Sequence, residues 1–224
     1  SHRFVMDYLV EEVLTQQPEA VQAFLLRTSV LERMCGPLCD AVLERTDSAS
    51  VLADLHRRVQ LVIAMDHDEQ RFRCHPLLLE ELSADLRTYE SVQIPVLHER
   101  ACRWFDAHGD RDAAIRHATA SGDADLAAAM IWPAVPRCVA SGNLDQLHFW
   151  LRGLTDAQIA SNRWLSMAAT WAALQQGDAV AMGRWALIAD AHAGPRWREA
   201  ASSDPYAATV AVLHSVVGSG GLDD

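Results

Sequence analysis

Apolar residues recur every three or four positions along most of the chain, and short polar or glycine-containing turns separate the apolar runs. This spacing predicts amphipathic helices that each bury one face. In the first ninety residues it predicts a short helix opened by Gly36-Pro37 and longer helices at about residues 4–16, 18–31, 50–58 and 76–89. Pro18 and Pro76 suit the starts of two of these helices, because the first helical position needs no N–H donor.

A β-hairpin interrupts these helices. Residues 61–65 form an apolar, β-prone run, residues 66–70 are polar, and residues 71–74 alternate as a half-buried strand does. Three helices followed by a hairpin and another helix are the plan of a winged-helix domain. We therefore expect such a domain over residues 1–90, with a short link to the helices after it.

Two glycine–aspartate turns organise the middle of the chain, at Gly109-Asp110 and Gly122-Asp123. Glycine tolerates the left-handed conformation that ends a helix, and aspartate can cap the free N–H groups of the next one. Turns this tight make successive helices antiparallel. Because one such pair cannot bury its apolar face alone, we expect it to stack on neighbours, as in helical-repeat proteins.

The same pattern continues to the end of the chain. Helices are predicted at residues 96–108, 111–121, 124–141 with a break at Pro133 and Pro136, 144–154, 156–176, 179–192 and 206–217. The turns at Gly142 and Gly177 are 35 residues apart, near the period of tetratricopeptide (TPR) repeats. The predicted fold is thus mainly α: a winged-helix domain with a small β-hairpin, then an antiparallel, TPR-like helical array over residues 91–224. The glycine-rich residues 218–221 indicate that this array is truncated.

Composition narrows the possible functions. The formal net charge is −11, no basic face or tail is visible, and every cation is an arginine, since the chain contains no lysine. Sequence-independent DNA binding needs clustered cations, so we expect no direct nucleic-acid contact. The lack of lysine excludes the phosphate-loop and Schiff-base lysines. No apolar run has the length of a membrane span and no secretory signal opens the chain, so we expect a cytoplasmic protein without membrane contact.

The sequence shows no spacing that is typical of a metal or catalytic site. The five cysteines are an odd set without paired C-x-x-C motifs, which favours reduced thiols used as small apolar side chains. Cys74, His75, His67, Cys35 and Cys39 have suitable residue types for a metal but unsuitable spacing. The polar residues 66–69, three acidic residues and His67, fit the tip of a hairpin better than an acid–base pair. We expect no metal and no enzymatic activity.

The chain resembles a known family through an ordered set of short runs. The runs are Tyr8–Leu14, Phe24–Leu31, Leu38–Val42, Leu97–Ala101, Trp104-Phe105, His108-Gly109, Ala113–Ala118, Gly122-Asp123 and Ala127-Ala128. Over residues 4–131 they resemble the region between the ATPase core and the repeat domain of MalT-type transcriptional activators, the large ATP-binding members of the LuxR family. Beyond Ile131 only a generic helical-repeat pattern continues.

This resemblance implies how an intact protein would work. It would hold ADP at rest, bind a small-molecule or protein inducer through the repeats, exchange ADP for ATP, self-assemble, and contact DNA through a C-terminal helix-turn-helix. The partners of this segment would be the protein's own ATPase domain, the inducer and further copies. Since these 224 residues contain no phosphate loop, we expect no cofactor held by this chain alone, with ATP or ADP belonging to the intact protein.

The resemblance also assigns a role to His75. It stands where a Met-His-Asp motif occurs in the winged-helix domains of related signalling ATPases, and the histidine of that motif contacts the β-phosphate of ADP. An imidazole at a helix start can donate to a phosphate beside the free backbone N–H groups. Here Cys74 and Pro76 replace the flanking residues of the motif. The alternative is that His75 caps the helix or packs against the hairpin.

A second candidate site lies in the predicted array. Stacked helical hairpins form a concave groove in which aromatic faces can hold a ligand. The candidate groove residues are Trp150, Trp171, Arg184 and Trp185, with Trp164, Arg152 and Arg163 nearby in sequence. The alternative is that the tryptophans are core residues, because aromatic side chains at helical spacing usually pack.

Two other functions remain open. A helical-repeat module of this kind can serve another enzyme, such as a protein kinase that carries a MalT-like regulatory region. A winged helix can also bind DNA itself, which the acidic balance of this chain disfavours.

Overall fold

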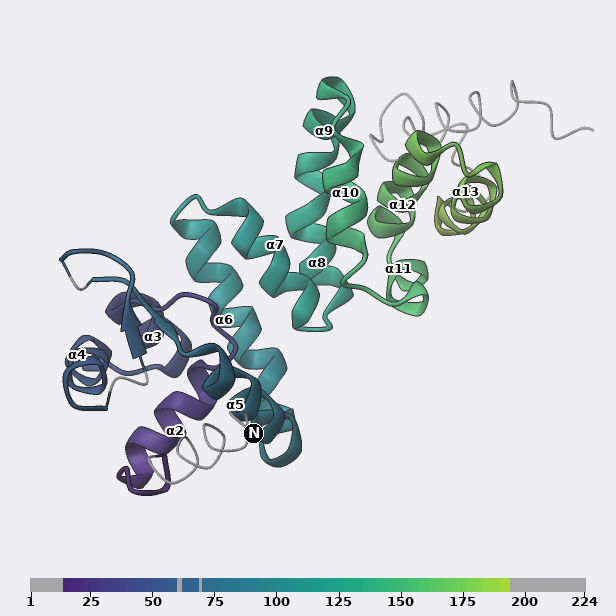
Figure 1. Ribbon diagram of the computed structural model, residues 1–224. Helices are drawn as coiled ribbons and strands as arrows, with labels where there is room; N and C mark the ends of the chain where they lie inside the picture. Colours follow the sequence, from purple (N-terminus) through teal and green to yellow (C-terminus); the bar gives the residue numbers. More distant parts are fainter. Residues whose placement is uncertain (1–13, 60–61, 69, 194–224) are drawn as a thin grey trace, which may run out of the picture. The chain divides into compact units, whose positions relative to one another are not determined.

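The computed structural model describes residues 14–59, 62–68 and 70–193 (Figure 1). Most of the helix predicted at residues 4–16 and all of that predicted at 206–217 lie outside the described residues. The chain divides into two compact units between Asp110 and Arg111. Among the described helices, none combines the length and the apolar character that crossing a bilayer requires.

The first unit is a winged helix, as the sequence predicts. Its β1 and β2 pair antiparallel, with Val62 opposite Cys74 and Ala64 opposite Phe72. Met34 adds a bridge to Phe72 through two backbone hydrogen bonds of 2.7 and 2.8 Å, which the sequence pattern does not reveal. The elements are α2 (Glu19–Thr28), α3 (Gly36–Leu43), α4 (Ser48–Val59), β1 (Val62–Ala64), β2 (Phe72–Cys74), α5 (Pro76–Tyr89), the 3-10 turn η1 (Ser91–Gln93) and α6 (Ile94–Ala107).

Helix α6 belongs to this unit, although the sequence pattern assigns its residues to the array. Its Leu97 and Ala101 are buried in the same core as Leu38 of α3. Arg100 extends from α6 to the end of α3, where it donates to the carbonyl of Val42 at 3.0 Å and pairs with Glu44 at 2.6 Å. The structural division therefore falls at residue 110 rather than at residue 90.

At its C-terminal end α6 carries an aromatic stack. The rings of Trp104 and His108 lie 3.8 Å apart and 15° from parallel, and His108 Nδ1 is 2.7 Å from the carbonyl oxygen of Trp104. The pairing follows from helical geometry, because residues four apart face each other on one side of a helix.

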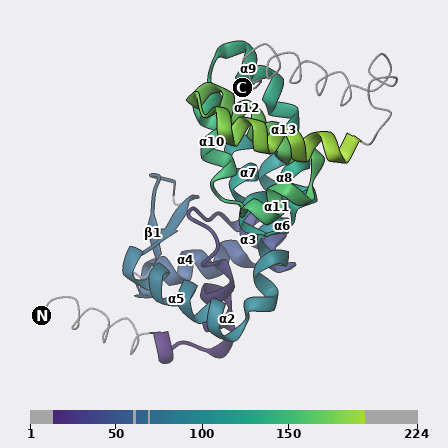
Figure 2. The same cartoon turned by 90° about the vertical axis from the view of Figure 1, so that its right-hand side faces the viewer.

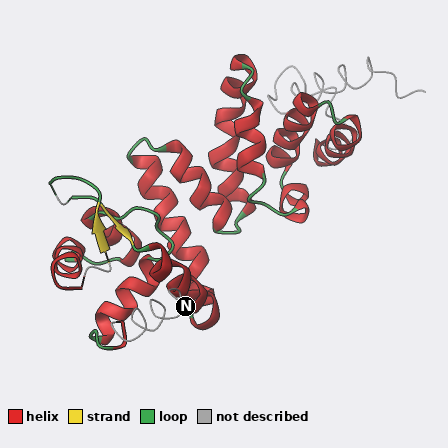
Figure 3. Cartoon of the chain, in the orientation of Figure 1, coloured by secondary structure: helices red, strands yellow, loops and turns green. Residues whose placement is uncertain are grey.

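The second unit is a series of short antiparallel helices (Figures 2 and 3). Gly122, Gly142 and Gly177 close its turns with φ of 78°, 68° and 68°, as the glycine turns predicted. Asp123 then caps the next helix by accepting from the N–H groups of Asp125 and Leu126 at 2.8 and 3.1 Å. The elements are α7 (Arg111–Ala120), α8 (Ala124–Ile131), the 3-10 turn η2 (Trp132–Ala134), α9 (Val135–Ser141), α10 (Leu144–Leu151), α11 (Asp156–Ser161), α12 (Arg163–Gln176) and α13 (Ala179–Ala193).

One predicted helix is wrong: residues 156–176 form two helices instead of one. Asn162 takes an extended conformation between them, and its Oδ1 accepts from the N–H groups of Trp164 and Leu165 at 2.9 and 3.3 Å. Thr155 and Gln158 form a capping box that starts α11. The apolar period continues across Asn162, so the break is set by these side-chain caps and not by the pattern.

Candidate functional site

His75 is the residue directly before α5. Its side chain makes no capping hydrogen bond, and its buried Nδ1 has no hydrogen-bond partner within the described ranges. The preceding Cys74 is buried opposite Val62, and burial raises the pKa of its thiol to about 12. His75 therefore does not cap α5, whereas packing against the hairpin and contact with a phosphate both stay open as alternatives.

The surroundings of His75 fit one supporting contact to a phosphate. The start of α5 offers partial positive charge and backbone N–H groups, although Pro76 supplies no N–H. A complete nucleotide site also needs a cradle of backbone amides, and the 224 residues contain neither a glycine-rich phosphate loop nor the lysine that belongs to such a loop. His75 and the start of α5 are therefore not a nucleotide site by themselves.

The second unit contains a groove of about 310 Å³ among α10, α11, α12 and α13. Its lining includes three small side chains of α12, Ala169, Ala172 and Ala173. The larger side chains that line it include His148, Leu151, Arg152, Asp156, Ile159 and Trp185.

Of the four predicted groove residues, the structure places Trp185 in the lining and Arg184 directly beside it. Trp185 lines the groove with 7% of its surface exposed. The guanidinium carbon of Arg184 lies 4.5 Å from the centre of the Trp185 ring, and its Nη2 is 2.7 Å from Oδ2 of Asp156. Trp185, Arg184 and Asp156 thus form one cluster that joins α13 to the start of α11.

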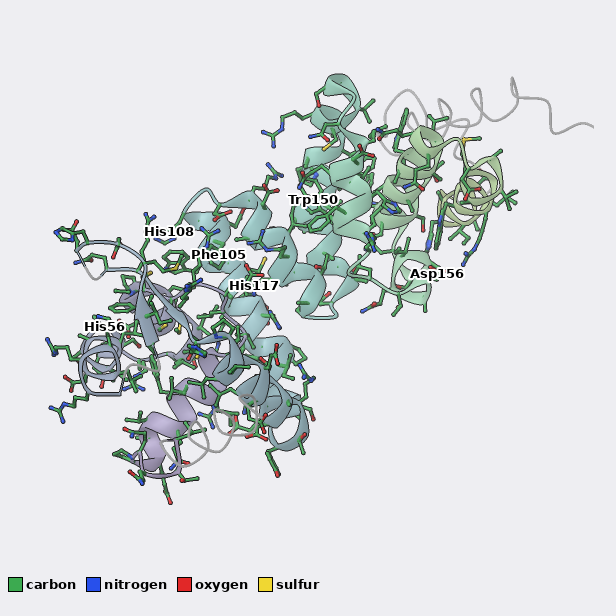
Figure 4. All side chains as sticks on the ribbon, in the orientation of Figure 1. His56, Phe105, His108, His117, Trp150 and Asp156 are labelled. Carbon is green, nitrogen blue, oxygen red and sulfur yellow. The ribbon has the colours of Figure 1, made fainter. Side chains whose placement is uncertain are left out.

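The other two predicted residues do not line the groove. Trp150 is 4% exposed and packs in the core of the unit. Figure 4 shows it among the helices, away from Asp156 at the start of α11. Trp171 is half-buried against the same core. The alternative that the tryptophans are packing residues therefore describes Trp150 and Trp171, and it also describes Trp185, which belongs to the same core and lines the groove.

Sequence reasoning missed several groove residues, among them His148, Asp156 and Asp178. Each stands at or near a helix end, where the apolar period gives no information about orientation. Of these three residues, Asp178 has a recognisable sequence pattern, because it directly follows Gly177. It caps α13 by accepting from the N–H of Ala181 at 2.9 Å. A turn-plus-cap pattern predicts the helix start but not which cavity lies beside it.

The lining of the groove contains charged residues of both signs. Its charged edge mixes Arg152 with Asp156 and Asp178, and Asp156 is already paired with Arg184. In the described ranges no cluster of three histidine, cysteine or acidic side chains is placed to hold a metal ion. Desolvation raises the pKa of Cys39 to about 12 and that of Cys102 to about 11, so these thiols stay protonated at neutral pH.

Within the described residues the structure thus shows a winged helix followed by helical hairpins, with a groove among the hairpins and a histidine Nδ1 without a hydrogen-bond partner directly before α5. The family model described as the MalT winged helix domain matches residues 10–94. Residues 10–94 therefore form a winged-helix domain of the MalT family, as the resemblance predicted.

Two kinds of curated protein align with this chain. The serine/threonine-protein kinase PknK of Mycobacterium tuberculosis is 29% identical over 169 residues, which are 75% of this chain and 15% of the kinase. The HTH-type transcriptional regulator MalT of Yersinia pestis is 34% identical over 120 residues, which are 54% of this chain and 13% of the regulator. The chain thus corresponds to about a seventh of the length of each relative.

Proposed function

We propose that this chain is the regulatory and sensor segment of an ATP-dependent, MalT-like regulator of the LuxR family. Its array would bind a ligand or partner, and its winged helix would act as a movable lid on a nucleotide site in the protein's own ATPase domain. The observation that carries this proposal is a MalT-type winged helix over residues 10–94, followed directly by a helical array with a groove. The chain itself would be regulatory and not enzymatic.

The unpartnered Nδ1 of His75 supports the lid role. A buried polar atom without a partner costs free energy, of the order of 1–3 kcal/mol, unless a ligand or water satisfies it. A phosphate oxygen held by the ATPase domain would satisfy the imidazole in one position of the lid and leave it unpaired in the other. Differential binding of this kind is what shifts a two-state equilibrium.

The Arg184–Trp185–Asp156 cluster supports the sensor role. It joins α11 to α13 at the edge of the groove, so a ligand that competes for the guanidinium of Arg184 would change the link between these helices. The inducer would be a small molecule or a protein segment, and self-assembly would follow binding. In keeping with the net charge of −11, the segment would work in the cytoplasm without contacting DNA or a membrane.

A second candidate is a regulatory module of a protein kinase. One observation favours it: the alignment with PknK extends over 75% of this chain, against 54% for MalT. The sequence around this segment in its gene separates the two candidates, because a kinase domain upstream would support the module and a LuxR-type helix-turn-helix downstream would support the regulator.

Native mass spectrometry of the protein, purified gently from cell extract, tests the sensor role. We expect a stoichiometric small-molecule adduct that Arg184→Gln removes and that the control Arg103→Gln keeps, since Arg103 forms an exposed pair with Glu99 in the other unit. An adduct that persists in Arg184→Gln would contradict a role for this cluster. A ligand-free protein that forms dimers would indicate a protein-interaction role for the array instead.

A further inference from the structure

The winged-helix unit contains a cavity that is distinct from the groove of the array and has no part in the proposed lid role. It has a volume of about 330 Å³ and lies where the end of α2 meets α5 and the start of α6. This volume is at the lower end of the range typical of small-molecule sites. The lining residues that matter are Ser29, Val30, Leu86, Arg87, Ile94 and His98.

Ser29 has an unsatisfied hydroxyl in this cavity. The residue is 8% exposed, and its Oγ is buried with no hydrogen-bond partner among the residues that the structure describes. A buried hydroxyl is normally hydrogen-bonded, so an orphan that lines a cavity indicates that the bound occupant contributes the missing partner. Ser29 can donate to an acceptor atom placed inside.

Arg87 is the one formally charged residue among those that line the cavity, and its side chain is exposed at the rim. The neighbouring charges cancel, because Arg27 of α2 is paired with Glu90 at 2.8 Å. The ends of α2 and α5 add partial negative charge, but the terminal carbonyls of Leu26 and Leu86 already accept backbone N–H groups. The full positive charge of Arg87 therefore determines the electrostatic preference of the cavity, which favours an anion.

The remaining lining groups select the rest of the ligand. Val30, Leu86 and Ile94 give the cavity an apolar wall. His98 is partly buried, and desolvation lowers its pKa to about 4, so at neutral pH it is an uncharged hydrogen-bonding group. A ligand that fits has one acidic group and a compact apolar body.

We propose that this cavity binds a small monocarboxylic acid, with the carboxylate between Arg87 and the Ser29 hydroxyl and the apolar body against Val30, Leu86 and Ile94. The inference goes beyond the proposed function, because it involves neither the groove nor His75. Arginine is well suited to this task, since its planar guanidinium matches the geometry of a carboxylate.

An NMR titration of the whole chain with 3-methylbutanoate at pH 7 tests the proposal. We expect saturable shifts of the backbone amides of Val30, Arg87 and Ile94. Arg87→Gln should weaken the fitted affinity at least about tenfold, the effect expected from losing one charge-assisted hydrogen bond. The control Arg57→Gln should leave the affinity unchanged, because Arg57 is exposed on α4 and paired with Asp54.

A second ligand makes the result decisive. The uncharged analogue 3-methylbutanamide keeps the apolar body and loses the charge, so it should bind at least about tenfold more weakly than the acid. Equal binding of acid and amide, or an affinity unchanged by Arg87→Gln, would overturn carboxylate recognition. The absence of any saturable shift up to about 10 mM acid would show that water alone fills the cavity and would also overturn the proposal. None of these outcomes depends on the groove or on nucleotide binding.

Discussion

Gly36 is a residue at which the winged helix has no room for a side chain. A Cβ at this position would lie 2.7 Å from Cβ of Ala49 and 3.1 Å from its Cα, so α3 and α4 approach too closely for any side chain. We expect Gly36→Ala to destabilise the unit by about 1–3 kcal/mol, as overpacking of a core does. Native-state hydrogen exchange of the α3 and α4 amides measures this loss.

Gly183 provides the matched control. It lies inside α13, where a Cβ would meet nothing within 4 Å and φ is not in the left-handed region. Gly183→Ala should stabilise its unit by about 0.5–1 kcal/mol, because alanine loses less backbone freedom in a helix. Equal destabilisation by the two substitutions would contradict the steric explanation for Gly36.

His98 makes stability depend on pH. Its folded-state pKa of about 4 lies below the unfolded value of 6.5, so the unfolded chain binds the proton first as the pH falls. The contribution of His98 to stability is therefore complete above pH 6.5 and is lost as the pH falls from 6.5 to 4. Between about pH 7 and 5 the wild type should lose about 2 kcal/mol more than His98→Gln, measured by urea unfolding followed by circular dichroism. A loss that is equal in both proteins would show that His98 is not the cause.

The sequence could name candidate residues but not their surroundings. A motif position indicates His75 and residue type indicates Trp185, and both lie where a ligand contact is possible. Trp150 has the same residue type and helical context as Trp185 and belongs to the same core, yet only Trp185 also lines the groove. The difference depends on how α10 packs on α12, which a repeat of apolar positions does not specify.

At the scale of elements, Asn162 decides where α12 begins. Its side chain accepts from two N–H groups of α12 and donates to Oδ1 of Asp125 on α8 at 2.7 Å. We expect Asn162→Ala to cost about 1–2 kcal/mol, the usual value of an N-cap plus a further hydrogen bond. Hydrogen exchange of the first-turn amides of α12 measures this effect.

Asn143 is the natural comparison for Asn162. It occupies the same N-cap position before α10, but its side chain makes no capping hydrogen bond. Asn143→Ala should therefore change stability by less than about 0.5 kcal/mol. A similar loss in both variants would mean that the intrinsic preference of asparagine, and not the observed bonds, is responsible.

Most elements were predictable because local signals agree with the apolar period. The helix at Pro76–Tyr89 and the turns at Gly109, Gly122, Gly142 and Gly177 match the expected positions. The sequence did not predict the Met34–Phe72 bridge or the division of residues 156–176. Both features depend on partners distant in sequence or on side-chain caps, which periodicity does not detect.

At the scale of the whole molecule, the division at residue 110 predicts two separate unfolding reactions. Gly36→Ala should lower hydrogen-exchange protection in the winged-helix unit only, and Asn162→Ala in the array only. In the double variant the two losses should add within about 0.5 kcal/mol, as they do for independent sites. Loss of protection in both units from either single substitution would show that the chain unfolds as one cooperative body.

The stack of Trp104 on His108 affects how such experiments can be read. Trp104 is the only tryptophan before residue 111, whereas the other six follow it. Intrinsic fluorescence therefore reports mainly on the array, and the winged helix contributes a single indole, which is stacked on His108. Replacing the other tryptophans by phenylalanine would leave Trp104 as a single optical probe of the winged helix.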